Sequence, residues 1–256
     1  IFLGGDCMGQ IKRPGGTDGL GYYTAWEKSS ENGCIYCGKP AFTREHVPSK
    51  AFLTRPYPQD LATVPACFEC NNGFSSDEKY VSCFLDVLKE SVYQGYTRRA
   101  DTSKRLSDDI DLSNLIAEQI KLIDGKVKFA VDANKLRRIL LKLAQGHAGY
   151  EFDHINFDNS NITIWYEFAF NLSLDMVQEL EEIPQMDIMP EVGSRSSVTP
   201  FILQNVETGE ALAFTLWNEV QEDQYRYQVF YNEAGGVSVK IVIYELLYAR
   251  IDFDLS

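Results

Sequence analysis

The chain has 256 residues, of which 45% are hydrophobic, 24% are charged and 12% are aromatic. This length is enough for one or two domains with a substantial core, and the composition excludes wholesale disorder. No apolar run approaches the ~18 residues of a transmembrane helix, so we expect no membrane contact and a cytoplasmic location. Because the chain opens at Ile1 and not at methionine, we expect that residues precede it.

The charge is unevenly distributed along the chain. The net charge is −13, yet the first 100 residues carry 11 basic and 11 acidic side chains, so the excess acid lies entirely behind them. A chain coated in phosphate-binding charge is excluded, but the first part remains able to approach a polyanion.

The first hundred residues contain three kinds of sequence. Residues 1–33 are rich in glycine and predict a loop or extended arm. Residues 34–75 are dominated by turn signals and paired cysteines. From Ser76 the apolar side chains recur at helical spacing, which predicts a helix that ends near Gly95.

A polar connector around residues 98–105 is the expected domain boundary. Beyond it, residues 108–124 predict an amphipathic helix, residues 126–131 a short strand, and residues 134–149 a second strong helix. The last of these carries four basic residues that face either phosphate or, as is more usual, solvent: Lys135, Arg137, Arg138 and Lys142.

From Asn161 onward the sequence is rich in β-branched and aromatic residues, and four segments predict strands: 161–170, 211–220, 225–231 and 237–244. The last two read as a hairpin joined through residues 232–236. We therefore expect an α+β protein with a Gly-rich arm (1–33), a cysteine-bearing module (34–97) and an acidic α+β C-terminal domain (98–256) that serves targeting, regulation or assembly.

Four of the six cysteines form two C-x-x-C pairs: Cys34 with Cys37, and Cys67 with Cys70. Two such pairs favour one tetrahedral structural zinc ion with four thiolate ligands. Two redox pairs or buried free thiols are the alternative. The single cysteines, Cys7 and Cys83, are expected to be ordinary buried thiols.

The loop between the pairs carries the candidate chemistry. It holds 29 residues, more than the ~15–20 of a simple zinc ribbon. Glu45 precedes His46 within it, and Asn71 directly follows the last cysteine. The zinc ion would fix both ends of this loop, so the three side chains are expected to surround a second metal site.

The combined pattern C-x-x-C, E-H-x-x-P and C-x-x-C-N resembles the zinc-containing branch of the HNH, or ββα-metal, endonucleases, although Pro48 comes one place early. The resemblance covers residues 34 to 90, and it implies a zinc-stapled ββα-metal module followed by helices and an antiparallel β-rich domain. It implies that Glu45 and Asn71 bind a catalytic Mg²⁺ or Mn²⁺ ion and that His46 is the general base.

The chemistry of these residue types supports the same roles. A neutral imidazole with a pKa near ~6.5 suits the deprotonation of water. A hard divalent ion held by carboxylate and amide oxygens keeps open positions for phosphate and water. Each residue also has a structural alternative: an ordinary structural histidine for His46, a pair with Arg44 or Lys50 for Glu45, and a helix cap for Asn71.

Several flanking residues are weaker candidates for a role at the predicted metal site. Asp60 lies near the position where the family's orienting asparagine is found, so it is the candidate partner of His46. Asn72 is a fallback ligand or a turn residue, and Glu78 is a helix-capping or helix-surface residue or an outer ligand. Three basic residues are candidates for phosphate contact or are simply solvated: Arg44, Lys50 and Arg55.

The sequence therefore predicts an endonuclease that hydrolyses DNA, with RNA not excluded and with 5′-phosphate and 3′-hydroxyl products implied by the resemblance. The family's common uses suggest defence against foreign DNA. The acidic C-terminal part would bind a protein partner, mediate self-association or hold the nuclease silent. The alternative is a non-catalytic module in which zinc organises a nucleic-acid or protein contact surface.

Overall fold

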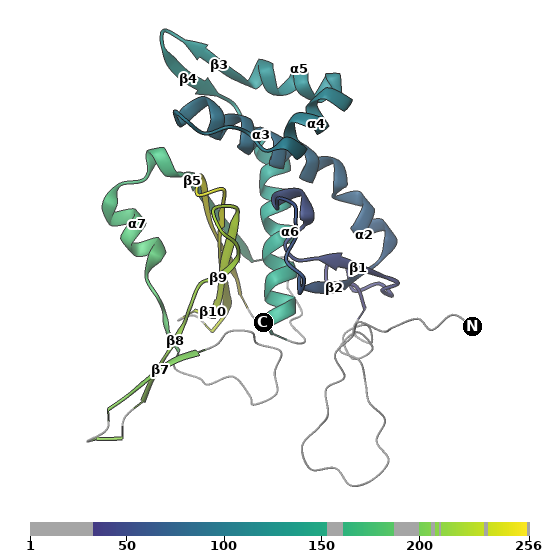
Figure 1. Cartoon of the computed structure of the whole chain (residues 1–256). Coiled ribbons are helices and arrows are strands. Elements are labelled where there is room, and N and C mark those ends of the chain that lie inside the picture. The colour runs from purple at the N-terminus through teal and green to yellow at the C-terminus, as the bar shows by residue number, and fades with distance from the viewer. Residues whose placement is uncertain are drawn as a thin grey trace.

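A computed structural model of the chain describes residues 33–152, 161–186, 200–205, 208–209, 211–232 and 235–254. The fold is mixed α+β, with helices grouped around an antiparallel sheet (Figure 1). Residues 1–32 of the Gly-rich arm, which include Cys7, lie outside these residues. Within them, no helix is both long and apolar enough to cross a bilayer.

The cysteine-bearing segment folds as a two-stranded hairpin followed by two helices. Strands β1 (Thr43–His46) and β2 (Thr63–Ala66) pair antiparallel, with Glu45 opposite Val64 and His46 opposite Thr63. A short 3-10 turn, η1 (Lys50–Phe52), lies in the connection. Helices α2 (Phe68–Gly73) and α3 (Ser75–Val92) follow at once. The helix predicted from Ser76 thus begins one residue earlier and ends three residues short of Gly95.

The region after residue 100 differs in part from its prediction, because most of the polar connector expected at residues 98–105 is helical. Helices α4 (Ala100–Asp108) and α5 (Ile110–Gln119) are followed by a hairpin of β3 (Ile120–Ile123) and β4 (Lys126–Phe129). The prediction of helix through residue 124 is wrong at its end. Asp124 and Gly125 both adopt positive φ, 51° and 71°, as a tight hairpin turn requires, and this turn reverses the chain.

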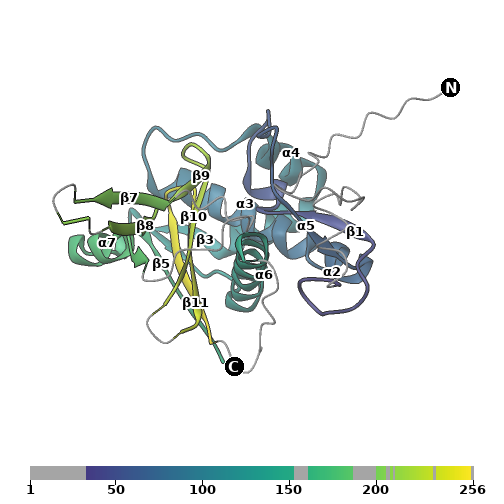
Figure 2. The same ribbon diagram turned by 90° about the horizontal axis from the view of Figure 1, so that it is seen from below.

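Helix α6 (Ala133–Glu151) lies between the hairpin of the module and the large sheet, and it contacts both (Figures 1 and 2). Two glycines on one of its faces let the module approach closely. A β-carbon on Gly146 would lie 3.0 Å from a methyl group of Val47, and one on Gly149 would lie 2.4 Å from Ile35. Both faces of this helix are therefore covered by protein.

The large sheet has the strand order β5-β12-β11-β10-β9 and is antiparallel throughout. Its strands are β5 (Ile162–Phe168), β9 (Asn218–Gln221), β10 (Tyr225–Tyr231), β11 (Val237–Ile243) and β12 (Leu247–Phe253). The hairpin expected between residues 225–231 and 237–244 is β10 with β11. A turn η2 (Ala169–Asn171) and helix α7 (Leu174–Glu181) follow β5.

A smaller sheet has the order β6-β8-β7 and is formed by β6 (Gln185–Met186), β7 (Pro200–Gln204) and β8 (Ala211–Thr215). The segment predicted as one strand at 211–220 is thus two strands, β8 and β9, that belong to different sheets. The break falls at Leu216 and Trp217, which are not in a strand.

One hydrophobic cluster runs across the expected domain boundary at residue 97. It contains Phe84 and Leu88 of α3, Leu140 of α6 and Ile241 of β11, and all four side chains are fully buried. Burial of shared apolar surface is the main favourable term in folding, so the module and the C-terminal part stabilise each other. The hairpin and α2 are held against this common core.

Candidate metal centre

The two C-x-x-C pairs meet at one point. The sulfur atoms of Cys34, Cys37, Cys67 and Cys70 all lie within 4.8 Å of one another, and no other group of three or more His, Cys, Asp or Glu side chains in the described residues is as close. The first pair lies in a turn before β1. Cys67 caps α2, and Cys70 lies in that helix.

The geometry fits a tetrahedral zinc ion. Zn–S bonds of about 2.3 Å place the sulfurs of a tetrahedron about 3.8 Å apart. The sulfurs of Cys37 and Cys67 are 3.7 Å apart, far longer than the ~2.05 Å of a disulfide. All four thiols are free. These residues can hold one structural ion with a closed coordination shell.

A backbone amide favours the thiolate form of one cysteine of the second pair. The amide of Cys70 donates to the sulfur of Cys67 at 3.3 Å at the start of α2. This donation is the main reason why the pKa of Cys67 falls to about 7. A thiolate is the form that binds metal, so the helix start favours the ligating state of Cys67, whereas burial raises the pKa of Cys70.

The hairpin places Glu45 and Asn71 on the same side of β1. Side chains alternate along a strand, so Thr43 and Glu45 face one side, while Arg44 and His46 face the other. Asn71, in α2, donates its amide Nδ2 to the hydroxyl of Thr43 at 2.9 Å. This bond ties the residue after the last cysteine to the Glu45 face and directs its other amide atom, Oδ1, away from Thr43.

Glu45 belongs to a buried charge cluster formed by three elements. Its Oε1 accepts a hydrogen bond of 2.8 Å from the ammonium of Lys142 in α6, which also contacts Glu78 of α3. Glu45 and Glu78 are each 8% exposed and Lys142 is 2% exposed. Burial raises the pKa of the Glu45 carboxyl, and the Lys142 charge opposes that rise. With Glu45 and Glu78 ionised, the cluster carries one excess negative charge.

His46 is half-buried at the end of β1. Burial, followed by the positive charges of Lys50 and Lys142, lowers the pKa of its imidazole. The neutral form, which can accept a proton, is therefore favoured at neutral pH. Among the described residues no hydrogen bond joins His46 to Asp60 or to Asn71.

A buried hydroxyl without a partner adjoins the charge cluster. Tyr36, between the first two cysteines, has its Oη buried, and it finds no hydrogen-bond partner in the described part of the chain. Its pKa is well above the ordinary value, first because of burial and then because Glu45 and Glu78 are near. Carboxylate and amide oxygens are ligand types that Mg²⁺ and Mn²⁺ prefer, so Glu45 and Asn71 each carry a donor atom that suits a hard divalent ion.

Two of the candidate outer residues lie away from the cluster. Asp60 is exposed in the loop before β2, and Asn72 is exposed, with its carbonyl accepting from Ser75 at 2.9 Å. Glu78, in contrast, is buried in the cluster. Its role is the contact with Lys142, and the capping role considered for it is not what the structure records.

The three basic candidates differ in exposure. Arg44 is exposed on the His46 face of β1, and Lys50 is half-buried, with its ammonium 5.5 Å from the centre of the Tyr57 ring. Arg55 is 75% exposed and lies 4.0 Å from Asp101. Only Arg44 lies on the strand that carries Glu45 and His46.

The sequence pattern wrongly predicts that the side chain of Lys142 is exposed. Its position in an amphipathic helix predicts contact with solvent or phosphate, yet it is buried because α6 has protein on both sides. Gly146 and Gly149, spaced three apart on this helix, are the one signal in the sequence for a second close neighbour.

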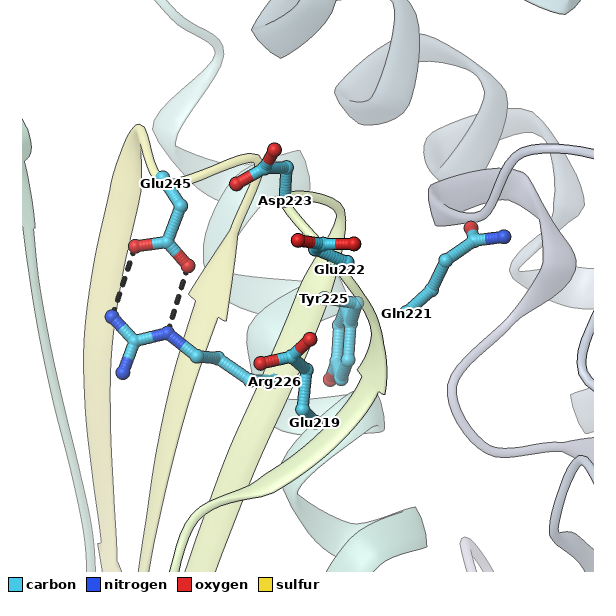
Figure 3. Close-up of a pocket in the computed structure, with 7 residues that line it drawn as sticks. All are labelled: Glu219, Gln221, Glu222, Asp223, Tyr225, Arg226 and Glu245. Carbon is cyan, nitrogen blue, oxygen red and sulfur yellow. Dashed lines mark hydrogen bonds and ion pairs between the residues drawn. The ribbon is translucent and has the colours of Figure 1, made fainter.

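An acid-lined hollow of about 350 Å³ lies elsewhere, between β9, β10 and the turn before β12 (Figure 3). Glu219, Glu222 and Asp223 line it, and Glu245 is paired with Arg226. Gln221 points away from these carboxylates and donates to the carbonyl of Thr54 at 2.8 Å. The excess of carboxylates that line this hollow disfavours an anionic ligand such as a phosphate.

Comparisons with protein-family models, with curated proteins and with solved structures find no match to this chain.

Proposed function

We propose that the chain is a zinc-stabilised endonuclease of the HNH type that hydrolyses phosphodiester bonds of DNA with the help of one Mg²⁺ or Mn²⁺ ion. The observation that carries the proposal is the bond between Asn71 and Thr43, which brings the amide that follows the last cysteine to the Glu45 face of the hairpin. His46 lies at the end of the same strand, with its side chain on the opposite face from Glu45.

Each residue has one role in this proposal. Glu45 and Asn71 would hold the divalent ion through their Oε2 and Oδ1 oxygens, which carry no recorded hydrogen bond in the described residues. When bound, such an ion polarises the phosphate and stabilises the leaving 3′ oxygen. His46, kept neutral by its lowered pKa, would take the proton of the attacking water from the opposite side of the phosphate.

The zinc ion would act on structure alone. A site with four thiolates keeps no open position for substrate, so the ion would only fix the hairpin against α2. Arg44, on the same face of β1 as His46, is the best-placed cation for a neighbouring phosphate. Defence against foreign DNA is the role that this activity suggests, and RNA remains a second substrate to be tested.

The test is cleavage of a supercoiled plasmid and of a structured RNA in Mg²⁺ or Mn²⁺. We expect nicking or linearisation by the wild type and at least about a hundredfold loss in His46→Ala, because general-base groups contribute on this scale. Lys121→Ala, exposed on the β3–β4 hairpin, is the control and should cut like the wild type. Equal cutting by His46→Ala and the wild type would remove His46 from the mechanism.

A second candidate function is a non-catalytic zinc module that binds nucleic acid or protein. It is favoured by one observation: Glu45 and Asn71 both have structural partners, Lys142 and Thr43. This candidate predicts no cleavage by any variant, together with binding that His46→Ala does not weaken. A nucleic-acid titration followed by fluorescence anisotropy, run beside the plasmid assay, separates the two functions.

A further inference from the structure

Lys142 of α6 lies at the centre of a buried charge cluster. Its ammonium is almost fully buried and contacts carboxylates from two other elements, Glu45 of β1 and Glu78 of α3. A buried ammonium needs such partners, because an unpaired charge is costly to remove from water. The three side chains join three separate parts of the chain at one point.

The contact with Glu45 involves only one carboxylate oxygen. Lys142 donates to Oε1 at 2.8 Å, and no hydrogen bond to Oε2 is recorded in the described part of the chain. The carboxylate is thus held in one orientation with one oxygen left over. A carboxylate fixed in this way can offer a divalent ion a single, preorganised ligand atom.

The charges of the cluster also matter. Two carboxylates and one ammonium sum to −1, so a divalent ion next to Glu45 would meet a net attraction that Lys142 reduces and Glu78 increases. The buried hydroxyl of Tyr36, which has no hydrogen-bond partner in the described residues, is close enough to feel the charge of the same carboxylates.

We propose that Lys142 is a positioning residue that orients Glu45 for divalent-ion binding and, together with Glu78, sets the net charge that determines the affinity for that ion. The inference rests on the proposed function for the location of the ion. Its test, however, measures ion binding without nucleic acid, so the two can fail separately.

The experiment uses the full-length, zinc-loaded chain and titrates Mn²⁺, with free Mn²⁺ followed by electron paramagnetic resonance. Four proteins differ in cluster charge: the wild type (−1), Lys142→Met (−2), Glu78→Gln (0) and the double variant Lys142→Met/Glu78→Gln (−1). Bound zinc and the thermal midpoint are measured for each. Lys79→Met, which removes a half-exposed ammonium from α3, is the control.

A unit charge about 5 Å from a divalent ion changes affinity by about tenfold even in a water-like dielectric. We therefore expect Mn²⁺ to bind Lys142→Met about tenfold more tightly and Glu78→Gln about tenfold more weakly, with the double variant and Lys79→Met close to the wild type. Cleavage by Lys142→Met at saturating Mn²⁺ should nevertheless fall by at least about tenfold, because Glu45 is no longer oriented.

A merely structural role for Lys142 would weaken binding and cleavage together, and that result would overturn the proposal. So would unchanged Mn²⁺ affinity in a folded Lys142→Met protein, or no Mn²⁺ binding by the wild type. If Lys142→Met loses zinc, the Mn²⁺ affinity of Glu78→Gln becomes the test. An affinity equal to that of the wild type contradicts the proposal, and a weaker affinity supports it. If His46→Ala loses cleavage while Lys142→Met cuts like the wild type, the proposed function stands and this inference fails.

Discussion

The ammonium of Lys142 lies 2.8 Å from Oε1 of Glu45, although 97 positions separate the two residues in the chain. The contact joins the hairpin that follows the first cysteine pair to the helix that supports the large sheet. A module that looks autonomous in the sequence is thus completed by a side chain from the C-terminal part.

The zinc site should be necessary for folding of the hairpin and α2. Cys34→Ser removes one of four ligands, and we expect the bound zinc to fall from one ion per chain to none, with a lower thermal midpoint, because metal binding supplies folding free energy here. Metal content by mass spectrometry and thermal unfolding measure this. Cys83→Ser is the matched control, since Cys83 is a buried free thiol in the core of α3 and should leave zinc bound. Full zinc retention in Cys34→Ser would contradict the four-thiolate site.

Asn71 and Asn72 form a natural matched pair. Asn71 is tied to Thr43 on the Glu45 face, whereas Asn72 is exposed. We expect Asn71→Ala to lose at least about tenfold in Mn²⁺ affinity and in plasmid cleavage, and Asn72→Ala to change neither by more than about twofold. The reverse order of effects would assign the ligand role to Asn72.

His147 should make stability fall on acidification. Its Nε2 lies 2.8 Å from the hydroxyl of Tyr225, its ring stacks on Tyr227 at 3.7 Å, and burial lowers its pKa well below 6.5. Below pH 6.5 the unfolded chain therefore binds a proton that the folded chain does not. Stability is fully present above that pH and falls by about 1.4 kcal/mol per pH unit below it, until the folded pKa is reached.

Urea unfolding at several pH values between 5 and 7.5 measures the effect of His147. In His147→Gln the loss of unfolding free energy per pH unit should be smaller by the ~1.4 kcal/mol that one proton contributes, because carboxylates titrate equally in both proteins. Identical slopes in the two proteins would show that His147 does not bind a proton differently on unfolding. The hydroxyl of Tyr227 also contacts Glu151 at 2.6 Å, so Glu151→Gln is a useful second comparison.

The buried ion pair of Asp86 and Arg99 should be sensitive to loss of one partner. Asp86 is fully buried and accepts from Nε of Arg99 at 3.1 Å, from its backbone amide at 3.0 Å and from Tyr96 at 2.6 Å. Asp86→Ala leaves the guanidinium of Arg99 buried without its carboxylate, which typically costs about 3–5 kcal/mol of unfolding free energy. Denaturant titration measures this loss. Glu69→Ala, which breaks an exposed pair with Lys39, should have no measurable effect.

A fragment that ends at residue 97 should not fold cooperatively. The apolar face of α3 packs against α6, α4 and β4, which all follow residue 97, so truncation exposes Phe84 and Leu88 to water. Far-ultraviolet circular dichroism with thermal unfolding should show no sharp transition in the fragment, even with zinc present. A sharp, zinc-dependent transition would show that the module folds alone, and it would then allow a direct test of whether the acidic C-terminal part silences it.

Local sequence determined much of the fold. The cysteine spacing placed four thiolates on two short turns, and the structure brings these together because each C-x-x-C pair needs only its own turn to present two sulfurs. The helical periodicity of α3 and α6 and the hairpin of β10 with β11 also follow from short-range patterns. The helix predicted through residue 124 failed because the turn at Asp124 and Gly125 outweighs the periodicity that precedes it.

The tertiary structure alone decided the surroundings of Glu45. Nothing in the sequence near Glu45 points to Lys142 or Glu78, because their meeting depends on how α6 packs between the hairpin and the sheet. A periodic pattern reports one buried face of a helix, and it cannot report that the opposite face is also covered. The sequence therefore determined which groups are able to bind a metal, whereas packing determined their charge balance, since only the folded chain removes Lys142 from water.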